Sequence, residues 1–256
     1  MYDGSTATAE AAMMAVASAK KCDTVLVSET VDKKILDVVN TYAHFHGMKI
    51  GMIAEKDGVT DKADYEQKMT QGGVAGVILQ QPNYYGIVED YTGFADIAHA
   101  NKALMIMNSV AADLAVLKTP AEWGADIAVG DGQSLGISMQ FGGPNVGYLC
   151  CKEKLIRKMP GRIVGMTKDS RGQRAFVLTL QAREQHIRRQ KATSNICSNQ
   201  SLMALFVTVY MSVMGKEGLK EAAEMSYAGA HYMMDCLVAT GKFKPTYDKP
   251  LSLIHI

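Results

Sequence analysis

The sequence GDGQSLGISMQFGGPNVGYL, from Gly130 to Leu149, is rich in glycine and small polar residues. It contains three such clusters, and they are followed by an apolar, strand-like segment over Val146 to Cys151. Glycine allows close backbone approaches that a Cβ atom would prevent, and loops of this composition commonly lie beside a binding site. The stretch therefore marks a place where the chain passes close to something else, and the segments around it indicate the fold.

Short apolar runs alternate with helical patterns on the N-terminal side of this loop. We expect strands over residues 23–28, 48–54, 74–80, 103–108 and 125–130. We expect helices over residues 6–20, 31–47, 61–73 and 88–101. A short helix is also expected from Thr119, because Thr119-Pro120-Ala121-Glu122 has the spacing of a capping box. This alternation predicts βαβ units, and so an α/β fold with a largely parallel sheet.

Ligands of such sheets bind at the carboxyl ends of the strands. Three loops follow predicted strands there, namely QQPNYYG (80–86), NSVAAD (108–113) and GDGQSLG (130–136). The stretch YDGSTA (2–7) at the start of the first helix has two explanations. Its backbone amides could hold an anion, but serine and threonine are common N-caps, and taken alone the stretch favours plain capping.

The pattern changes past Tyr148. GRIVGMTKDSRGQRAFVL (161–178) predicts a hairpin with a polar turn at 168–172, and from Leu180 onward the chain is expected to be mostly helical. We divide the chain into a large domain over 1–200 and helices leading toward a smaller domain over 201–250. Residues 251–256 back-translate to a sequence resembling a transposon-end adapter, so we interpret them as an artefact and the chain as an internal fragment.

The composition of the chain indicates which kinds of partner and which cellular compartment to expect. The chain has 256 residues, 48% of them apolar, and a net charge of +1, which argues against a nucleic-acid or anionic-membrane partner. We find no apolar run of about 18 residues and expect no membrane span. The five cysteines lack metal-ligand spacing. We interpret them as reduced, buried thiols of a cytoplasmic protein, and we expect no metal site.

Three motifs together indicate a family. They are YDGSTATAEA (2–11), QPNYYGIVED (81–90) and REQHIRRQKATSNIC (183–197). With the glycine-rich loop, they resemble the N-terminal half of glycine decarboxylase, the P-protein of the glycine cleavage system, which is subunit 1 where the enzyme is split into two chains. The resemblance runs from Tyr2 to about Pro250. It implies the large domain of a type I PLP-dependent transferase (aminotransferase-like), with a mostly parallel sheet between helix layers.

The resemblance also implies that the cofactor lysine is absent. In the catalytic half of the enzyme, a lysine ahead of a GGP turn forms a Schiff base with pyridoxal 5'-phosphate (PLP). Counting back from Gly142-Gly143-Pro144 places that position at Gln133, whose amide nitrogen is not a nucleophile. Asn108 similarly stands near the place where type I enzymes carry an aspartate against the cofactor pyridine. This chain is therefore not expected to hold the cofactor itself.

The implied activity needs partners. A PLP-carrying subunit 2 is expected to pair with this chain, as an α2β2 assembly (a heterotetramer), to decarboxylate glycine. The aminomethyl group then passes to the lipoyl cofactor of the H-protein, and CO2 is released. The family's subunit extends upstream of Tyr2 and adds a small domain after Pro250, so residues that touch substrate are expected to lie partly outside this sequence.

Candidate residues within the chain come from its basic segment. Arg183, His186 and Asn195 are the strongest, and Arg183 and His186 would share a face with Gln190 if 183–191 were helical. These cations could receive a carboxylate or an acidic patch of the lipoyl protein. The alternative, a solvated basic face with salt bridges to Glu184, is about equally supported.

Three other interpretations of the sequence can be compared with the residues present. Another type I PLP enzyme would need a lysine at position 133, and a nucleotide-binding domain would need a GxGxxG turn after its first strand. Neither feature is present. A purely structural or regulatory protein with the same fold is not excluded by the sequence.

Overall fold

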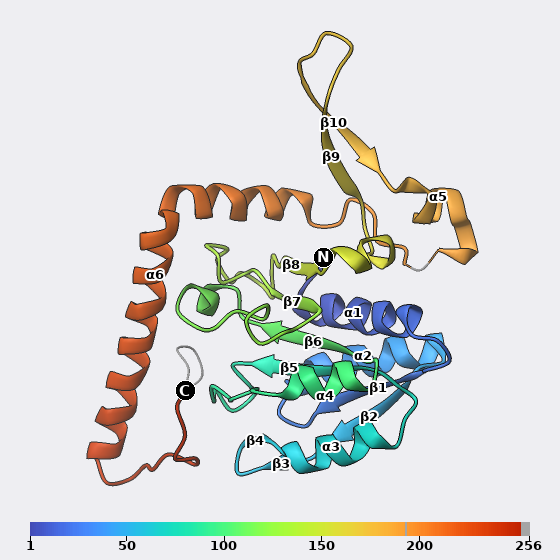
Figure 1. Cartoon of the computed structure of the whole chain (residues 1–256). Helices are drawn as coiled ribbons and strands as arrows, with labels where there is room; N and C mark the ends of the chain where they lie inside the picture. The colour runs from blue at the N-terminus through green and yellow to red at the C-terminus, as the bar shows by residue number, and fades with distance from the viewer. Residues whose placement is uncertain (193, 252–256) are drawn as a thin grey trace.

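The computed structural model describes residues 1–192 and 194–251. Its centre is a six-stranded sheet with the strand order β2-β1-β5-β6-β7-β8 (Figure 1). Neighbouring strands are parallel except for β8, which runs antiparallel to β7. The sheet strands are β1 (Thr24–Ser28), β2 (Lys49–Ile53), β5 (Val74–Gln81), β6 (Leu104–Ser109), β7 (Ile127–Asp131) and β8 (Gly147–Cys151). The five strands expected from the sequence are all present, and the largely parallel sheet is confirmed.

Helices cover both faces of the sheet. Ile78 and Ile106 point to the face covered by α1 and α2, whereas Val77 and Met105 point to the face covered by α3 and α4. Because successive strand residues point to opposite faces, a strand covered on both sides must be apolar throughout. All eight residues of β5 are buried. The covering helices are α1 (Gly4–Ser18), α2 (Lys33–His46), α3 (Lys62–Thr70) and α4 (Phe94–Ala100).

Local chemistry fixes the ends of these helices. Gly47, with φ of 66°, ends α2 in the left-handed conformation that glycine adopts without strain. The helix expected from Thr119 does not form, and that prediction is wrong. The capping-box contacts are nevertheless made, because Glu122 Oε2 accepts from the backbone nitrogen and Oγ1 of Thr119 at 2.8 and 2.7 Å. They close a single turn, after which the chain enters β7.

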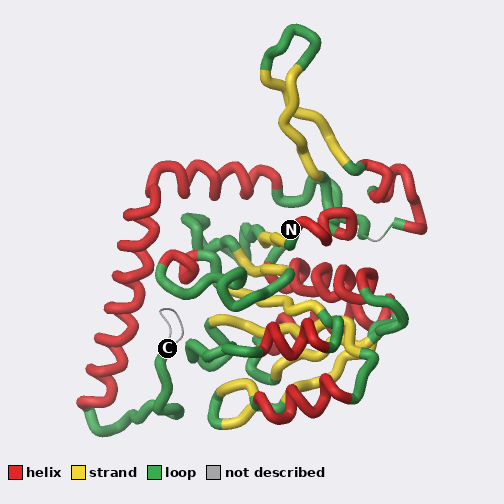
Figure 2. The backbone as a smooth tube through the Cα atoms, in the orientation of Figure 1, coloured by secondary structure: helices red, strands yellow, loops and turns green. Residues whose placement is uncertain are grey.

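The C-terminal part leaves the sheet. The predicted hairpin is confirmed as β9 (Ile163–Lys168) and β10 (Arg174–Thr179), and a smaller hairpin is formed by β3 (Glu55–Lys56) and β4 (Val59–Thr60). Helix α6 (Ser201–Ala239) bends sharply at Gly215, where φ is 62° and ψ is −175° (Figure 2). The expectation of mostly helical structure from Leu180 is wrong before α6. There the backbone forms only short pieces, namely η3 (Gln181–Arg183), α5 (Gln185–Arg188) and η4 (Arg189–Lys191). The remaining short helical turns are η1 (Ala112–Ala115) and η2 (Glu153–Lys158).

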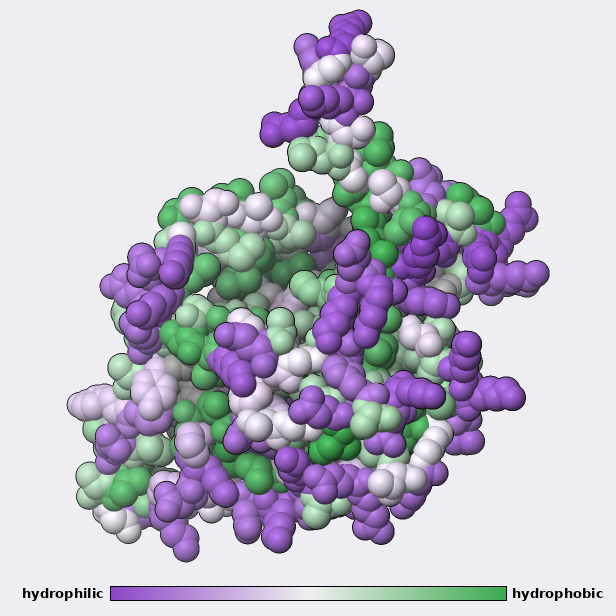
Figure 3. All heavy atoms as spheres, in the orientation of Figure 1, coloured by the Kyte–Doolittle hydropathy of each residue, from purple (hydrophilic) through white to green (hydrophobic). Residues whose placement is uncertain are grey.

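Helix α6 carries much of the exposed apolar surface. Hydrophobic residues gather over its first part and over the base of the β9–β10 hairpin, whereas the hairpin tip is hydrophilic (Figure 3). By length and composition α6 could cross a membrane, and its most apolar part is almost entirely exposed. One such helix is weak support for a membrane span, because a helix that packs against another protein passes the same test.

The cysteines differ from expectation in one respect. All five are free thiols, but Cys150, Cys197 and Cys236 are exposed rather than buried. Cys150 and Cys151 point to opposite faces of β8, as adjacent strand residues must, and only Cys151 packs against the core.

Candidate functional site

The three predicted loops lie side by side at one edge of the sheet. Strands β5, β6 and β7 are neighbours, and the register pairs Gln81 with Ser109 and Asn108 with Val129. The carboxyl ends of all three strands therefore meet at this edge, together with the first turn of α1, which contacts β7. The sequence prediction of a shared edge is confirmed.

The start of α1 is capped by its own residues. Asp3 Oδ1 accepts hydrogen bonds from the backbone nitrogen of Thr6 at 2.7 Å and from Thr6 Oγ1 at 2.9 Å. Thr6 Oγ1 in turn accepts from the backbone nitrogen of Asp3 at 3.2 Å. These contacts form a capping box, so the YDGSTA stretch adopts the capping role that its composition favoured.

A second carboxylate lies on the same helix end. Asp131, the last residue of β7, accepts from the backbone nitrogen of Gly4 through Oδ2 at 3.2 Å and from that of Gln133 through Oδ1 at 2.7 Å. Helix N-termini attract anions because free amides and the helix dipole point at them. Here the carboxylate of Asp131 is the anion at that position.

Glycine is required where these segments meet. A Cβ atom on Gly130 would overlap the carbonyl oxygen of Ser109, and one on Gly147 would overlap that of Asp3. A Cβ on Gly4 would lie 2.8 Å from the backbone nitrogen of Asp131, which is closer than real Cβ atoms approach. The glycine-rich segment is thus built around the start of α1 and the end of β6, which pack directly against it.

Gln133 and Asn108, which the resemblance places at cofactor-binding positions, make contacts within the protein. Gln133 Nε2 donates to the carbonyl oxygen of Pro144 at 3.0 Å. Asn108 Nδ2, which is buried, donates to Thr8 Oγ1 at 2.8 Å. An amide cannot form an imine with an aldehyde. The carboxylates of Asp3 and Asp131, which accept hydrogen bonds from backbone amides of the first turn of α1, would repel a phosphate. The residues at this edge therefore do not fit PLP.

The predicted basic residues are only partly brought together. His186 and Asn195 line one concavity with Arg162, whereas Arg183 lies on another side and donates through Nη2 to the carbonyl oxygen of Gly161 at 2.6 Å. The shared helical face expected for Arg183, His186 and Gln190 is wrong. Glu184, with ψ of 156°, is extended and separates Arg183 from His186, and φ of 53° at Arg189 separates Gln190 from both.

The alternative interpretation of this segment is supported only in part, because Arg162 lies outside it and the pair with His186 is a salt bridge only when that histidine is protonated. Glu184 is buried, and its Oε2 lies 3.5 Å from both Arg162 Nε and His186 Nδ1. Arg188 and Arg189 are exposed. Thr193, which belongs to the REQHIRR motif region, lies outside the described residues. Among residues 1–192 and 194–251, no group of three or more histidine, cysteine or acidic side chains is arranged to hold a metal ion.

A buried carboxyl group that the sequence did not predict lies beside this segment. Glu10, in the middle of α1, is 2% exposed and accepts from Ser194 Oγ at 2.7 Å. Burial raises its pKa to about 7, although the bond from Ser194 opposes that shift. The only signal in the sequence was a lone acidic residue inside the alanine-rich and methionine-rich run of the first helix. Glu10 lines a concavity of about 400 Å³ with Asn195 and Arg189.

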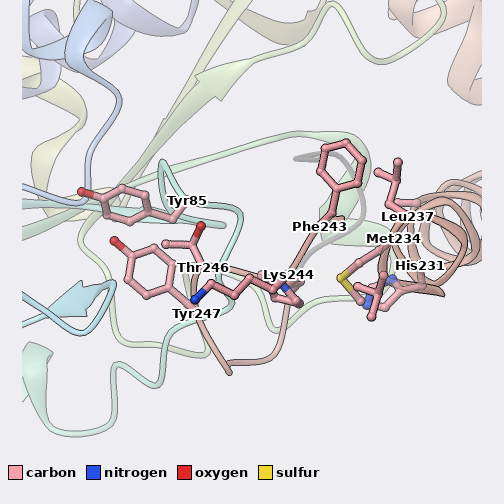
Figure 4. Close-up of a pocket in the computed structure, with 12 residues that line it drawn as sticks. Tyr85, His231, Met234, Leu237, Phe243, Lys244, Thr246 and Tyr247 are labelled. Atoms are coloured by element: carbon pink, nitrogen blue, oxygen red, sulfur yellow. The ribbon is translucent and has the colours of Figure 1, made fainter. Parts of the chain in front are cut away.

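The loop after β5 is held by a polar network. Asn83 is fully buried, and its Nδ2 donates to Glu89 Oε1 at 2.8 Å while its Oδ1 accepts the backbone nitrogen of Tyr85 at 2.9 Å. Asn83 thus has the turn-forming role considered for it. Tyr85 faces an apolar cavity of about 500 Å³ between Tyr247 and the C-terminal half of α6, where Met234 and Leu237 point inward (Figure 4).

Comparison with known proteins identifies the family. Residues 1–247 match the family described as "Glycine cleavage system P-protein". The chain belongs to this family. It is 48% identical over 251 residues to the "Probable glycine dehydrogenase (decarboxylating) subunit 1" of Desulforamulus reducens, covering 98% of this chain and 56% of that protein. The chain therefore spans about half the length of the curated relatives it matches.

Solved structures agree with the family assignment and the fold. The crystal structure of a glycine decarboxylase (P-protein) of the glycine cleavage system, in inhibitor-bound form, matches with a TM-score of 0.92 and 42% identity over 98% of this chain and 56% of that one. An alanine–glyoxylate aminotransferase from Nostoc sp. matches with a TM-score of 0.59 at 14% identity, covering 93% and 59% of the two chains. The family member described here thus has the PLP-dependent, aminotransferase-like fold, as its motifs predicted.

Proposed function

We propose that this chain is part of the glycine decarboxylase subunit that does not carry PLP, and that it acts together with a partner subunit that does. The observation that carries the proposal is the P-protein family match over residues 1–247, joined to relatives named as subunit 1. The sheet edge supports the division of labour, because Gln133 replaces a nucleophile with an amide and Asp131 occupies the anion position at α1.

The proposed complex decarboxylates glycine, releases CO2 and transfers the remaining aminomethyl group to the lipoyl cofactor of H-protein. PLP on the partner supplies the electron sink for the negative charge left on the substrate carbon. The role of this chain is to complete the walls of the pocket and to exclude water from it. We assign the complex to the cytoplasm and expect an α2β2 arrangement.

The basic segment supplies the candidate contacts of this chain with anionic groups. Arg183, His186 and Asn195 line concavities beside Glu184, and exposed Arg188 and Arg189 lie next to them. We propose that these side chains receive an acidic surface of the lipoyl-bearing H-protein. Charge-assisted hydrogen bonds of arginine to carboxylates are stronger than neutral ones, which suits a contact made and broken in every turnover.

The test uses the full-length subunit, its partner subunit, PLP and lipoylated H-protein. Carboxyl-labelled glycine is supplied, and labelled CO2 is measured for each subunit alone and for the mixture. We expect release only from the mixture with H-protein present. Equal release by the partner alone would contradict the proposal and would favour a structural or regulatory role for this chain.

A further inference from the structure

The buried carboxyl group of Glu10 has no cationic partner. Glu10 lies in the middle of α1 and is 2% exposed. Among residues 1–192 and 194–251, its one hydrogen bond comes from Ser194 Oγ, and no lysine, arginine or histidine forms an ion pair with it. Glutamate is almost never fully buried unless it is paired, because an isolated charge in a protein interior is strongly unfavourable. Glu10 therefore needs either a retained proton or a cation from outside the described chain.

Glu10 faces a concavity rather than the closed core. The concavity has a volume of about 400 Å³ and is lined by α1, α2 and the segments 185–192 and 194–195 (Figure 1). This volume lies within the range of about 300–1,000 Å³ that is usual for small-molecule sites. Met13, Phe45 and Ala192 give it an apolar wall, and Phe45 is 79% exposed. A small cation with an apolar part can therefore reach the carboxyl group of Glu10 from solvent.

A cation without an ion pair lines the same concavity. Arg189 is exposed, and it pairs with no carboxylate among the residues that the structure describes. Because Glu10 and Arg189 come from different elements and do not pair with each other, a carboxyl group and a guanidinium group border one space. Gln190 and Asn195 add amides, which both donate and accept hydrogen bonds. The concavity thus combines one acidic group, one basic group and an apolar wall.

We propose that this concavity binds a free amino acid with an aliphatic side chain, for which leucine is the probe. The ammonium group of the ligand supplies the cation that Glu10 lacks, its carboxylate pairs with Arg189, and its side chain packs against Met13 and Phe45. Hydrogen bonds between charged groups are stronger than neutral ones. A phosphate or a dicarboxylate would be repelled by Glu10, and a simple amine would leave Arg189 without a partner. The site needs neither the partner subunit nor PLP, so the proposal does not rest on the proposed function.

The test measures ligand binding to the full-length subunit, without its partner, by isothermal titration calorimetry at about pH 8. Burial raises the pKa of Glu10 to about 7, so its carboxyl group is mostly ionised at that pH. Leucine is compared with isocaproate, which lacks the ammonium group, with isoamylamine, which lacks the carboxylate, and with glycine, which lacks the aliphatic side chain. The variants are Glu10→Gln, Arg189→Gln and Phe45→Ala, and thermal unfolding checks that each is folded. Arg171→Gln, at an exposed position that does not line the concavity, is the control.

We expect leucine to bind about tenfold or more tightly than the other three compounds, because each of them lacks one contact. Glu10→Gln should weaken leucine binding by about tenfold or more and leave isocaproate binding unchanged. Arg189→Gln should weaken leucine binding to a similar extent and leave isoamylamine binding unchanged. The control should bind leucine as tightly as the unmodified subunit does.

Three results would each overturn the proposal. The first is that leucine does not bind to the unmodified subunit. The second is that isocaproate binds as tightly as leucine, which would mean that Glu10 keeps its proton and has a structural role alone. The third is that the variants bind leucine with unchanged affinity. If Glu10→Gln does not fold, Phe45→Ala decides, because its exposed side chain lies outside the core, and it should weaken the binding of leucine but not that of glycine.

Discussion

The Oδ2 atom of Asp131 lies 3.2 Å from the backbone nitrogen of Gly4, at the first turn of helix α1. In this fold that turn is where the carboxyl ends of the central strands and a helix N-terminus meet. A side-chain carboxylate there gives the Gly4 amide, which has no partner within the helix, an acceptor from elsewhere in the chain. It also repels any phosphate that would approach the same amides. We therefore predict two barriers to PLP, namely the Asp131 carboxylate and the glutamine at position 133.

Restoring the lysine is not expected to restore binding. The Gln133→Lys variant of the full-length subunit, incubated with PLP and reduced with borohydride, is predicted to carry no label at position 133, because Asp131 still occupies the anion position. Adding Asp131→Gly removes that carboxylate and is expected to permit labelling. Peptide mass spectrometry reads the result, and a label at position 133 in the single variant would show that Asp131 is no barrier.

Asp131 should also matter for stability. Asp131→Ala leaves the amides of Gly4 and Gln133 without their acceptor, and we expect it to lower the free energy of unfolding by about 1–2 kcal/mol. Urea unfolding followed by circular dichroism measures the change. Glu66→Ala, at an exposed position of α3, is the control and should change stability by less than about 0.5 kcal/mol.

Glu10 should make stability depend on pH near neutrality. Burial raises its pKa to about 7 in the folded protein, against about 4.3 in an unfolded chain. Between these values the folded state binds the extra proton, so the free energy of unfolding falls as pH rises from about 4.3 to about 7 and then levels off. The difference between these two pKa values corresponds to about 4 kcal/mol. The variant Glu10→Gln removes the titrating group but keeps a side-chain oxygen that can accept the hydrogen bond from Ser194.

Unfolding midpoints in urea across this pH range test the assignment. The difference in stability between Glu10→Gln and the unmodified protein should grow with pH up to about 7. A difference that stays constant across the range would mean that Glu10 does not titrate there.

Asp126 should make stability depend on pH in the opposite direction to Glu10. Its buried carboxylate lies 2.7 Å from His99 Nε2 and 3.0 Å from Lys152 Nζ. Burial alone would raise its pKa, but the hydrogen bonds from these groups outweigh burial and hold the pKa below its ordinary value. Its contribution is therefore fully present above about pH 3.9 and is lost as pH falls through the lower folded pKa.

Replacing this carboxylate tests its structural role. Asp126→Asn is predicted to lower the free energy of unfolding by about 2 kcal/mol at pH 7, because charge-assisted hydrogen bonds are lost from a buried site. Asp169→Asn at the exposed hairpin tip is a comparison for loss of one negative charge. An equal and small change in both variants, measured by urea unfolding, would be inconsistent with the buried network described here.

The sheet could be predicted from the sequence because burial on both faces leaves a clear signal. The run Val74 to Gln80 is apolar almost throughout, and Gly47 marks the end of α2 through its positive φ. The Thr119 turn shows the limit of local patterns. The capping-box contacts form as its spacing indicates, but Gly124, with φ of 86°, ends the turn and the chain enters β7 at Ile127.

The site was harder to predict because its key contacts join distant residues. Gln133 was found through the spacing of a family motif, but nothing near Asp131 in the sequence distinguishes it from an ordinary turn residue, and its partner Gly4 is 127 residues away. The same holds for Glu10 and Ser194, which are 184 residues apart. The expected helix of the basic segment is broken at extended Glu184 and again at Arg189, whose φ is positive, and no propensity signals either break.

The location of PLP in the assembled enzyme decides whether this chain is the subunit without the cofactor. The full-length subunit and its partner are mixed with PLP in the absence of glycine, reduced with borohydride, and digested for mass spectrometry. We expect a reduced cofactor label on a lysine of the partner subunit and none on any lysine of this chain. A stoichiometric label on a lysine of this chain would contradict the proposed division between the two subunits.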